Sequence, residues 1–218
     1  GRITYLPGIT GDTYTDFTPI GWTTGRVMAP VNWNLPPPMA KFAAFFRGRA
    51  FYGGNPENPT YLYYSHQLSD MRYGGSGLEA VAQPGNTVQI ASPDGGDFIT
   101  GIVVAGDYAL VFTQETTHML SADKNGDPIV TPMSQTVGCV ANRAAVSFEN
   151  KVFFMSKSGL YAFDGNKPVP ISSAFSSMIE NMPQAHLKEA VAWTDASERR
   201  AYFSVATGPG DSNNEVWS

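Results

Sequence analysis

The sequence predicts an all-β protein made of repeated small antiparallel sheets, arranged as in a β-propeller. Only 15% of the 218 residues are charged, 12% are aromatic, and 22 Gly and 16 Pro supply turns, a composition that favours sheets over helices. The phrase "AGDYALVFTQETTHMLSAD" (105–123) aligns without a gap on "FENKVFFMSKSGLYAFDG" (148–165), at an offset of 43 residues. Repeats of about 40–50 residues, each a small antiparallel sheet, are typical of β-propellers.

Each repeat is expected to contain a strand, a tight turn, a second strand, a loop and a third strand, which gives three to four blades. Turns such as Gly106-Asp107 and Glu149-Asn150 hold residues that tolerate a positive φ. A β-sandwich and an irregular β-barrel remain alternatives to the propeller. The predicted strands are 42–46, 50–53 and 61–65, then 101–105, 109–113 and 117–121, then 144–148, 152–156 and 160–163, and finally 190–194, 201–205 and 215–218.

One insertion interrupts the strands. Phe175, Met178, Ile179 and Met182 follow the i, i+3, i+4, i+7 spacing of an amphipathic helix, which predicts a helix over 173–181 that packs on its own sheet.

The first 40 residues differ from the rest. Residues 11–25 resemble a loop, "RITYL" (2–6) has the pattern of a strand, and the three prolines from Pro36 onward predict an extended lead-in. We therefore divide the chain into a loop-rich segment, 1–40, and a propeller-like domain, 41–218, and expect both to belong to a longer protein.

Composition also limits the function. A net charge of −5 and a pI near 5.1 argue against a surface that grips nucleic acid, because phosphate contacts require clustered Lys and Arg. A single cysteine excludes a disulfide within the chain and every thiolate metal cage. No run approaches the roughly 20 apolar residues of a membrane-spanning helix.

Motifs that carry chemistry are incomplete. The alternating Asp123, Asn125 and Asp127 match only part of a calcium loop and are expected to form an ordinary turn. Ser76 lacks the second glycine of a nucleophile elbow, and Cys139 is expected to be a small buried residue. The three histidines form no zinc motif; they are His66, His118 and His186. The sequence therefore predicts no catalytic residue, no metal site and no cofactor.

Aromatic residues are the remaining candidates for binding. Tyr61, Tyr63 and Tyr64 crowd one strand, with Tyr61 and Tyr63 expected on one face and Tyr64 on the other. They suit either sheet packing, which we favour, or a platform for sugars. The large apolar residues of the N-terminal loops are expected at an interface; together with the three tyrosines, the interface candidates are Trp22, Trp33 and Leu35.

Three longer phrases carry a resemblance to a known family. They are "PPPMAKFAAFFRGRAFYGGNPENPTYLYYSH", "GGDFITGIVVAGDYALVFTQETTHML" and "VGCVANRAAVSFENKVFFMSKSGLYAFDG". In this order, they resemble the β-propeller tail proteins of tailed bacteriophages, in particular the nozzle (tail tubular) and stabilisation-type proteins of short-tailed phages. The resemblance covers about three-fifths of the chain, from Pro36 to Gly165.

The resemblance implies a structural virion protein and not an enzyme. Such proteins assemble in the host cytoplasm into rings with copies of themselves, beneath the portal and adaptor, and the tail that contains them meets the host surface. DNA is expected to pass through the ring without specific binding. Two other functions stay open: a carbohydrate- or receptor-binding propeller, and a hydrolase that uses loop carboxylates such as Asp94, Asp97 and Asp123.

Overall fold

The computed structural model describes residues 2–4, 14–16, 39–65, 87–92, 95–124, 126–207 and 212–218. The chain divides into two compact units, Gly1–Trp33 and Asn34–Ser218, whereas the composition predicted a boundary after residue 40. Among the described helices, none has both the length and the apolar content needed to cross a membrane.

The first unit contains a short antiparallel pair of strands. β1 (Arg2–Thr4) lies where "RITYL" predicted a strand, and β2 (Tyr14–Asp16) pairs with it so that Ile3 faces Thr15. The prediction of a loop across residues 11–25 is therefore wrong at Tyr14–Asp16, where pairing with β1 satisfies the backbone.

The described part of the second unit contains four small antiparallel sheets, each of which follows the chain order without a crossover. We number them sheets 1 to 4. Sheet 1 contains β3 (Phe42–Phe46), β4 (Arg49–Gly53), β5 (Tyr61–Tyr64) and β6 (Thr87–Gln89). Sheet 2 contains β7 (Ile99–Ala105), β8 (Tyr108–Thr113), β9 (Thr117–Ala122) and β10 (Pro128–Ser134).

Sheets 3 and 4 repeat the same plan. The strands of sheet 3 are β11 (Ala145–Phe148), β12 (Lys151–Ser156), β13 (Gly159–Phe163) and β14 (Val169–Pro170). Those of sheet 4 are β15 (Val191–Asp195), β16 (Arg200–Val205) and β17 (Glu215–Trp217). All-β architecture is confirmed, and each of the twelve predicted strands overlaps an observed one.

Sequence reasoning missed the fourth strands, β6, β10 and β14. β10 begins with Pro128 and contains Pro132, and proline is compatible only with an edge strand, where its missing N–H has no partner to lose. The three-strand description of the repeat is therefore wrong for sheets 1 to 3, because the outermost strand is polar, irregular or very short.

In three of the repeats, the turn after the first strand contains residues with a positive φ, as predicted. Gly48 and Gly106 have φ values of 77° and 57°, and Glu149 and Asn150 have φ values of 47° and 61°. Such turns twist the two flanking strands in the direction that an antiparallel pair needs. The expected link between these residue types and tight hairpins is confirmed.

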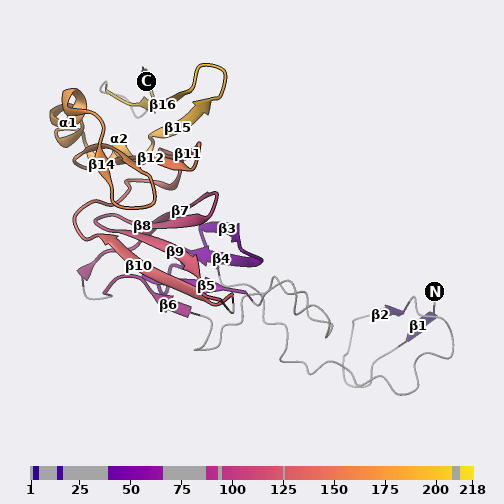
Figure 1. Ribbon diagram of the computed structural model, residues 1–218. Coiled ribbons are helices and arrows are strands. Elements are labelled where there is room, and N and C mark those ends of the chain that lie inside the picture. The colour runs from indigo at the N-terminus through magenta and orange to yellow at the C-terminus, as the bar shows by residue number, and fades with distance from the viewer. Residues whose placement is uncertain are drawn as a thin grey trace. The chain divides into compact units, whose positions relative to one another are not determined.

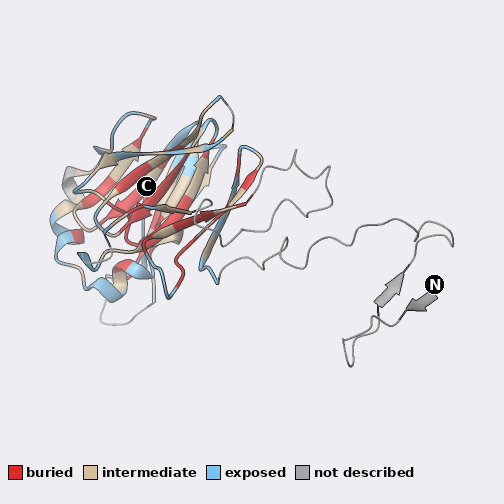
Figure 2. Cartoon of the chain, turned by 90° about the horizontal axis from the view of Figure 1, so that it is seen from below, coloured by how far each residue is buried: buried red, intermediate tan, exposed pale blue. Residues whose placement is uncertain are grey.

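The four sheets lie one after another in chain order. β7 contacts β3 on one side and β11 on the other, and β11 also contacts β15 (Figure 1). Figure 2 shows buried residues along the strands and exposed ones mainly at turns and helices. Apolar side chains fill the space between neighbouring sheets, in one cluster between sheets 1 and 2 and another that joins sheets 2, 3 and 4.

In the described residues, two helices and one short 3-10 helix lie between successive sheets. The predicted helix is observed as α1 (Ser173–Glu180), and its Ile179 is fully buried against the core. α2 (Gln184–Lys188) follows Pro183 and was not predicted, and η3 (Asn142–Ala144) precedes sheet 3. Packing of α1 on its own core is confirmed, since Phe175 and Met182 also contact that cluster.

Candidate functional site

Of the six predicted interface residues, the structure describes three. Trp22, Trp33 and Leu35 lie outside the described residues. Tyr61, Tyr63 and Tyr64 all lie on β5.

The three tyrosines alternate across sheet 1 as predicted. Tyr63 is opposite Tyr52 and Tyr64 is opposite Phe51, which lie on successive positions of β4. Tyr63 is only 8% exposed, and the Tyr64 ring packs 6.0 Å from that of Phe51. Rings in such positions stabilise the sheet and leave little open surface for stacking a sugar.

The loop carboxylates cap turns. An Asp97 oxygen accepts hydrogen bonds from the backbone N–H groups of Phe98 and Gln114, both at 2.9 Å, and Asp123 accepts one from the N–H of Asp127 at 2.8 Å. Asp94 lies outside the described residues. Within the described ranges, no group of three or more His, Cys, Asp or Glu side chains could hold a metal ion.

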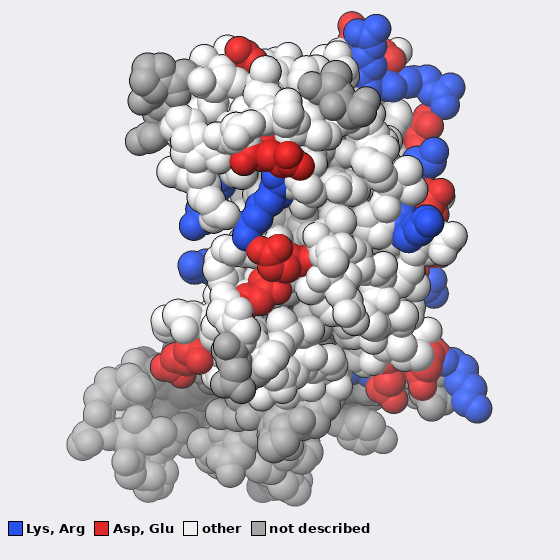
Figure 3. Space-filling view, turned by 90° about the vertical axis from the view of Figure 1, so that its left-hand side faces the viewer, with Lys and Arg blue, Asp and Glu red and all other residues white. Residues whose placement is uncertain are grey.

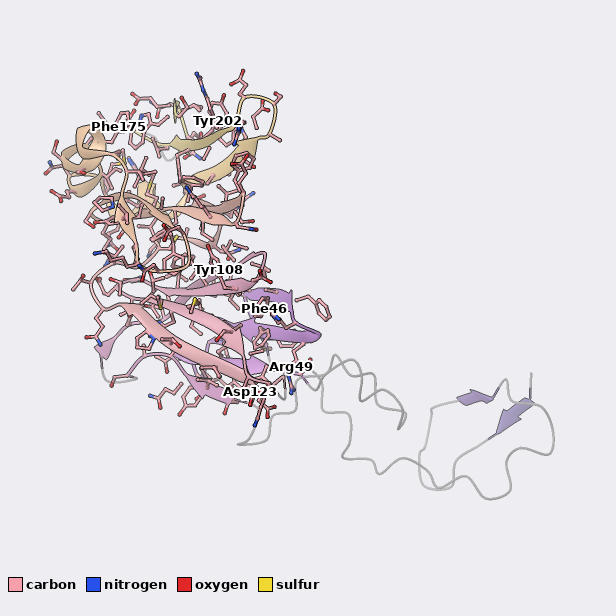
Figure 4. The ribbon with its side chains drawn as sticks, viewed as in Figure 1. Phe46, Arg49, Tyr108, Asp123, Phe175 and Tyr202 are labelled. Atoms are coloured by element: carbon pink, nitrogen blue, oxygen red, sulfur yellow. The ribbon has the colours of Figure 1, made fainter. Side chains whose placement is uncertain are left out.

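Arg49 joins sheet 1 to sheet 2. Its guanidinium donates to the carbonyl of Gly126 at 2.9 Å, to a carboxylate oxygen of Asp127 at 3.0 Å and to the carbonyl of Ser65 at 3.0 Å. It also lies 5.7 Å from the centre of the Tyr64 ring, a favourable position for a cation. Figure 4 shows Arg49 beside the loop that carries Asp123.

The sequence contains a signal for the burial of Arg49, which forms a clamp between sheets 1 and 2. Arg49, Phe51 and Gly53 occupy alternate positions of β4, and all three are buried. Because alternate residues of a strand share one face, an arginine in phase with a buried phenylalanine predicts a buried cation. Its partners follow only from the contact with sheet 2.

The hairpin turns after the first strand of each sheet form a connected row. At or directly beside these turns, each sheet is linked to the next by a hydrogen bond or an ion pair; the charged partners are exposed, whereas Tyr108, the first residue of β8, is half-buried. The links are Arg47 Nη2 to Asp107 Oδ1 (3.2 Å), Tyr108 Oη to the carbonyl of Asn150 (2.7 Å), and Arg199 Nη2 to Glu149 Oε1 (3.0 Å). Equivalent points of successive repeats therefore meet in the same way.

Sheet 4 has one buried face and one open face. Phe203, Val205 and Trp217 are at most 7% exposed and pack toward sheet 3. On the opposite face, the rings of Trp193 and Tyr202 stack 5.4 Å apart. Trp193 itself is 40% exposed, so an aromatic pair lies on the less buried face of sheet 4.

A hollow of about 490 Å³ lies between sheets 3 and 4. Its walls include Phe153, Phe175, Phe203 and Trp217, and the Phe175 and Trp217 rings stack 4.8 Å apart. As far as the structure describes it, the lining holds no His, Cys, Asp or Glu side chain. Arg199 and Arg200 also line the hollow, so its walls combine apolar rings with two cationic side chains.

Cys139 is confirmed as a small buried residue. It is fully buried, and its thiol donates to the carbonyl of Ala141 at 3.1 Å. Burial raises the pKa of the thiol to about 12, because a thiolate would lose its hydration there.

We therefore expect Cys139 to resist iodoacetamide in the folded protein near neutral pH, because only the thiolate reacts quickly. Intact-mass measurement should show an unmodified native chain and a singly modified chain in denaturant. Equal labelling rates in the two conditions would contradict the buried position.

The His118 side chain is expected to make the free energy of unfolding depend on pH. Burial lowers the pKa of its imidazole in the folded chain, although the negative charge of Asp97 acts in the opposite direction. The unfolded chain then binds more protons as the pH falls below about 6.5, so the free energy of unfolding is expected to decrease there and to be unaffected by this group at higher pH.

Denaturant unfolding at about pH 7.5 and about pH 5.5 checks this expectation, with His118→Gln as the reference, because glutamine does not titrate in this range. The variant should lose part of the acid destabilisation. An identical pH dependence in the two proteins would assign the effect to other groups.

The comparisons with known proteins identify no relative. No protein-family model matches the chain, and no curated protein is significantly similar to it. The described part of the chain is a series of small antiparallel sheets in chain order, with an aromatic pair on one face of sheet 4.

Proposed function

We propose that this chain is a structural protein of a phage tail, which acts by assembly into a ring around the path of the DNA. The proposal combines two independent supports. One is the ordered set of phrases between Pro36 and Gly165 that resembles phage tail propellers. The other is the repetitive way in which the sheets meet.

The observation that carries the proposal is the equivalence of successive contacts. The first strand of each sheet adjoins the first strand of the next, from β3 through β7 and β11 to β15. The turns that follow these strands are linked in the same order. One repeated rotation between neighbouring sheets accounts for both patterns, and that is the arrangement of propeller blades around an axis.

The two alternative folds have less support. A β-sandwich places two sheets face to face as layers, whereas sheets 2 and 3 here each have a neighbour on both faces. A closed barrel has continuous pairing around its wall, whereas hydrogen-bonded pairing here stops at the edge of each described sheet. We therefore adopt the blade arrangement for the proposed function.

The charges suit a protein that DNA passes without binding. The chain has a net charge of −5, and on the face shown in Figure 3 Lys and Arg are interspersed with Asp and Glu. Binding of a phosphate backbone depends on concentrated positive charge. A mixed, acidic surface is expected to leave DNA free to move past it.

Cryo-electron microscopy of the particle that carries this chain tests the proposal. The four sheets should fit density in a ring on the tail axis, and an antibody against the chain should label the tail. Antibody label on the capsid shell alone, or no density for the four sheets on the tail axis, would contradict the assignment. An antibody to the major capsid protein is the matched control.

A further inference from the structure

The connection between β13 and β14 contains the pair Asp164-Gly165. Because β13 ends at Phe163 and β14 begins at Val169, this pair lies outside the strands. Asp164 is exposed, and Gly165 has a φ of 102°. Glycine adopts such a backbone readily because it has no Cβ. The pair therefore combines an accessible carboxylate with a following nitrogen that no side chain shields.

Neither residue of this pair is held by a polar partner in the described part of the chain. There, the Asp164 carboxylate takes part in no hydrogen bond or ion pair, and the Gly165 N–H donates to no acceptor. Other carboxylates beside turns are held: Asp107 pairs with Arg47, and Asp97 accepts two backbone N–H groups. The carboxylate and the N–H of the pair can therefore approach each other without first breaking a hydrogen bond.

We propose that Asp164 is a site of spontaneous isoaspartate formation in the folded protein. The inference goes beyond the proposed function and does not depend on it. In the first step, the Gly165 nitrogen attacks Cγ of Asp164, and the new C–N bond closes a cyclic imide, a succinimide. The amide proton, a proton from solvent and one carboxylate oxygen leave as water.

Hydrolysis of the succinimide has two possible products. Cleavage of the bond between the nitrogen and Cγ restores Asp164. Cleavage of the bond between the nitrogen and the main-chain carbonyl carbon gives isoaspartate, in which the chain runs through Cβ and Cγ and the main-chain carboxylate is free. The water lost on closure is regained on opening, so the mass and the charge are unchanged. The backbone gains one methylene group between residues 164 and 165.

This change would occur beside a contact between sheets 2 and 3. The Tyr108 hydroxyl donates to the carbonyl of Asn150 at 2.7 Å and lies 3.3 Å from the carbonyl of Phe163. The Tyr108 ring lies 3.8 Å from the point that a Cβ on Gly165 would occupy. Burial and then the negative charge of Asp164 raise the pKa of the Tyr108 hydroxyl. Isomerisation therefore alters the backbone next to a side chain that links the two sheets (Figure 4).

Asp195 provides an internal control within the same chain. It is also followed by a small residue, Ala196. Its carboxylate accepts hydrogen bonds from the Ser197 hydroxyl at 2.6 Å, from the Ser197 N–H at 2.8 Å and from the Glu198 N–H at 3.3 Å. These bonds lower the pKa of the Asp195 carboxyl, because they favour its charged form. Ring closure requires a proton on the departing oxygen, so Asp195 is expected to stay unmodified.

Ageing of the whole purified chain near neutral pH, followed by trypsin digestion and mass spectrometry, tests the proposal. Asp164 is the only aspartate of the tryptic peptide 158–188. A second chromatographic form of this peptide, with unchanged mass and the backbone fragments of isoaspartate, is expected to accumulate with time. Deamidation of an asparagine changes the mass and stays distinguishable. The peptide 189–199, which contains Asp195, should keep a single form, and a fresh sample digested in parallel reports any isomerisation during digestion.

Two variants and a free peptide separate the chemistry from the fold. Asp164→Glu keeps the charge and should abolish the second form, because closure would have to form a larger and slower ring. Gly165→Ala should slow the reaction, because a methyl group shields the attacking nitrogen. A synthetic peptide of residues 158–188 gives the rate without the fold, and the native chain is expected to approach that rate.

Three results would overturn the proposal: no isoaspartate at residue 164 in the aged native chain, a native rate far below that of the free peptide, or equal isomerisation at Asp195. Circular dichroism confirms that each variant is folded before the rates are compared. Failure of this inference leaves the tail assignment untouched, because ageing of the purified chain does not involve the particle. Likewise, a particle that contradicts the tail assignment leaves the result at Asp164 in place.

Discussion

Phe154→Ala is expected to lower the free energy of unfolding by about 4 kcal/mol. Phe154 is fully buried, and its ring lies 4.7 Å from Phe112 on sheet 2 and 5.8 Å from Tyr161 on its own sheet. Removal of the ring leaves a cavity between two rigid sheets that cannot move together without disturbing both hairpins. Urea unfolding followed by circular dichroism measures the change.

Phe45→Ala is the matched control for this prediction. The same atoms are removed, but Phe45 is 52% exposed on the outer side of sheet 1, so a change below about 1 kcal/mol is expected. Equal losses for the two variants would mean that sheets 2 and 3 do not pack as described.

Arg49→Leu is expected to lower the free energy of unfolding by about 3 kcal/mol. The guanidinium donates to the carbonyl of Gly126 and the carboxylate of Asp127 across the junction with sheet 2, and to the carbonyl of Ser65 within sheet 1. Leucine fills part of the space but donates no hydrogen bond, so the buried carbonyl of Ser65 and the partly buried carbonyl of Gly126 lose a charged donor. The same denaturation experiment measures this loss.

The chain offers a close control for Arg49. Arg47 lies two residues earlier, and its ion pair with Asp107 joins side chains that are 51% and 97% exposed. Exposed pairs contribute little because water and salt screen them, so Arg47→Leu should cost less than about 1 kcal/mol. A larger loss at Arg47 than at Arg49 would refute the clamp between the sheets.

The strands that sequence reasoning identified are those with strong local signals. β8 and β12 consist mainly of apolar and β-branched or aromatic residues between turn formers, so their existence follows from composition and spacing. β10 and β14 were not predicted as strands because they contain prolines and exposed residues. Edge strands such as these are specified by the neighbour with which they pair, and a single segment does not contain that information.

The sequence predicted that aromatic side chains would lie on exposed sheet faces, but not which aromatic residues these would be. The predicted interface residues were Trp22, Trp33, Leu35, Tyr61, Tyr63 and Tyr64; the first three lie outside the described residues, and Tyr63 is buried. The prediction did not include Trp193 and Tyr202, which meet as cross-strand neighbours on β15 and β16. Period-two alternation places both on one face of sheet 4, but only the folded chain shows that the other face packs in the core.

Local sequence determined the hairpins of this protein, because turn residues with a positive φ and alternating side chains act within about 20 residues of each other. The tertiary structure decided which face of each sheet is covered, which cation is buried and which turns are linked. The reason is physical: Arg49 and Asp127 are 78 residues apart in the sequence and 3.0 Å apart in space, so their contact depends on how the sheets stack and not on the segment that contains either one.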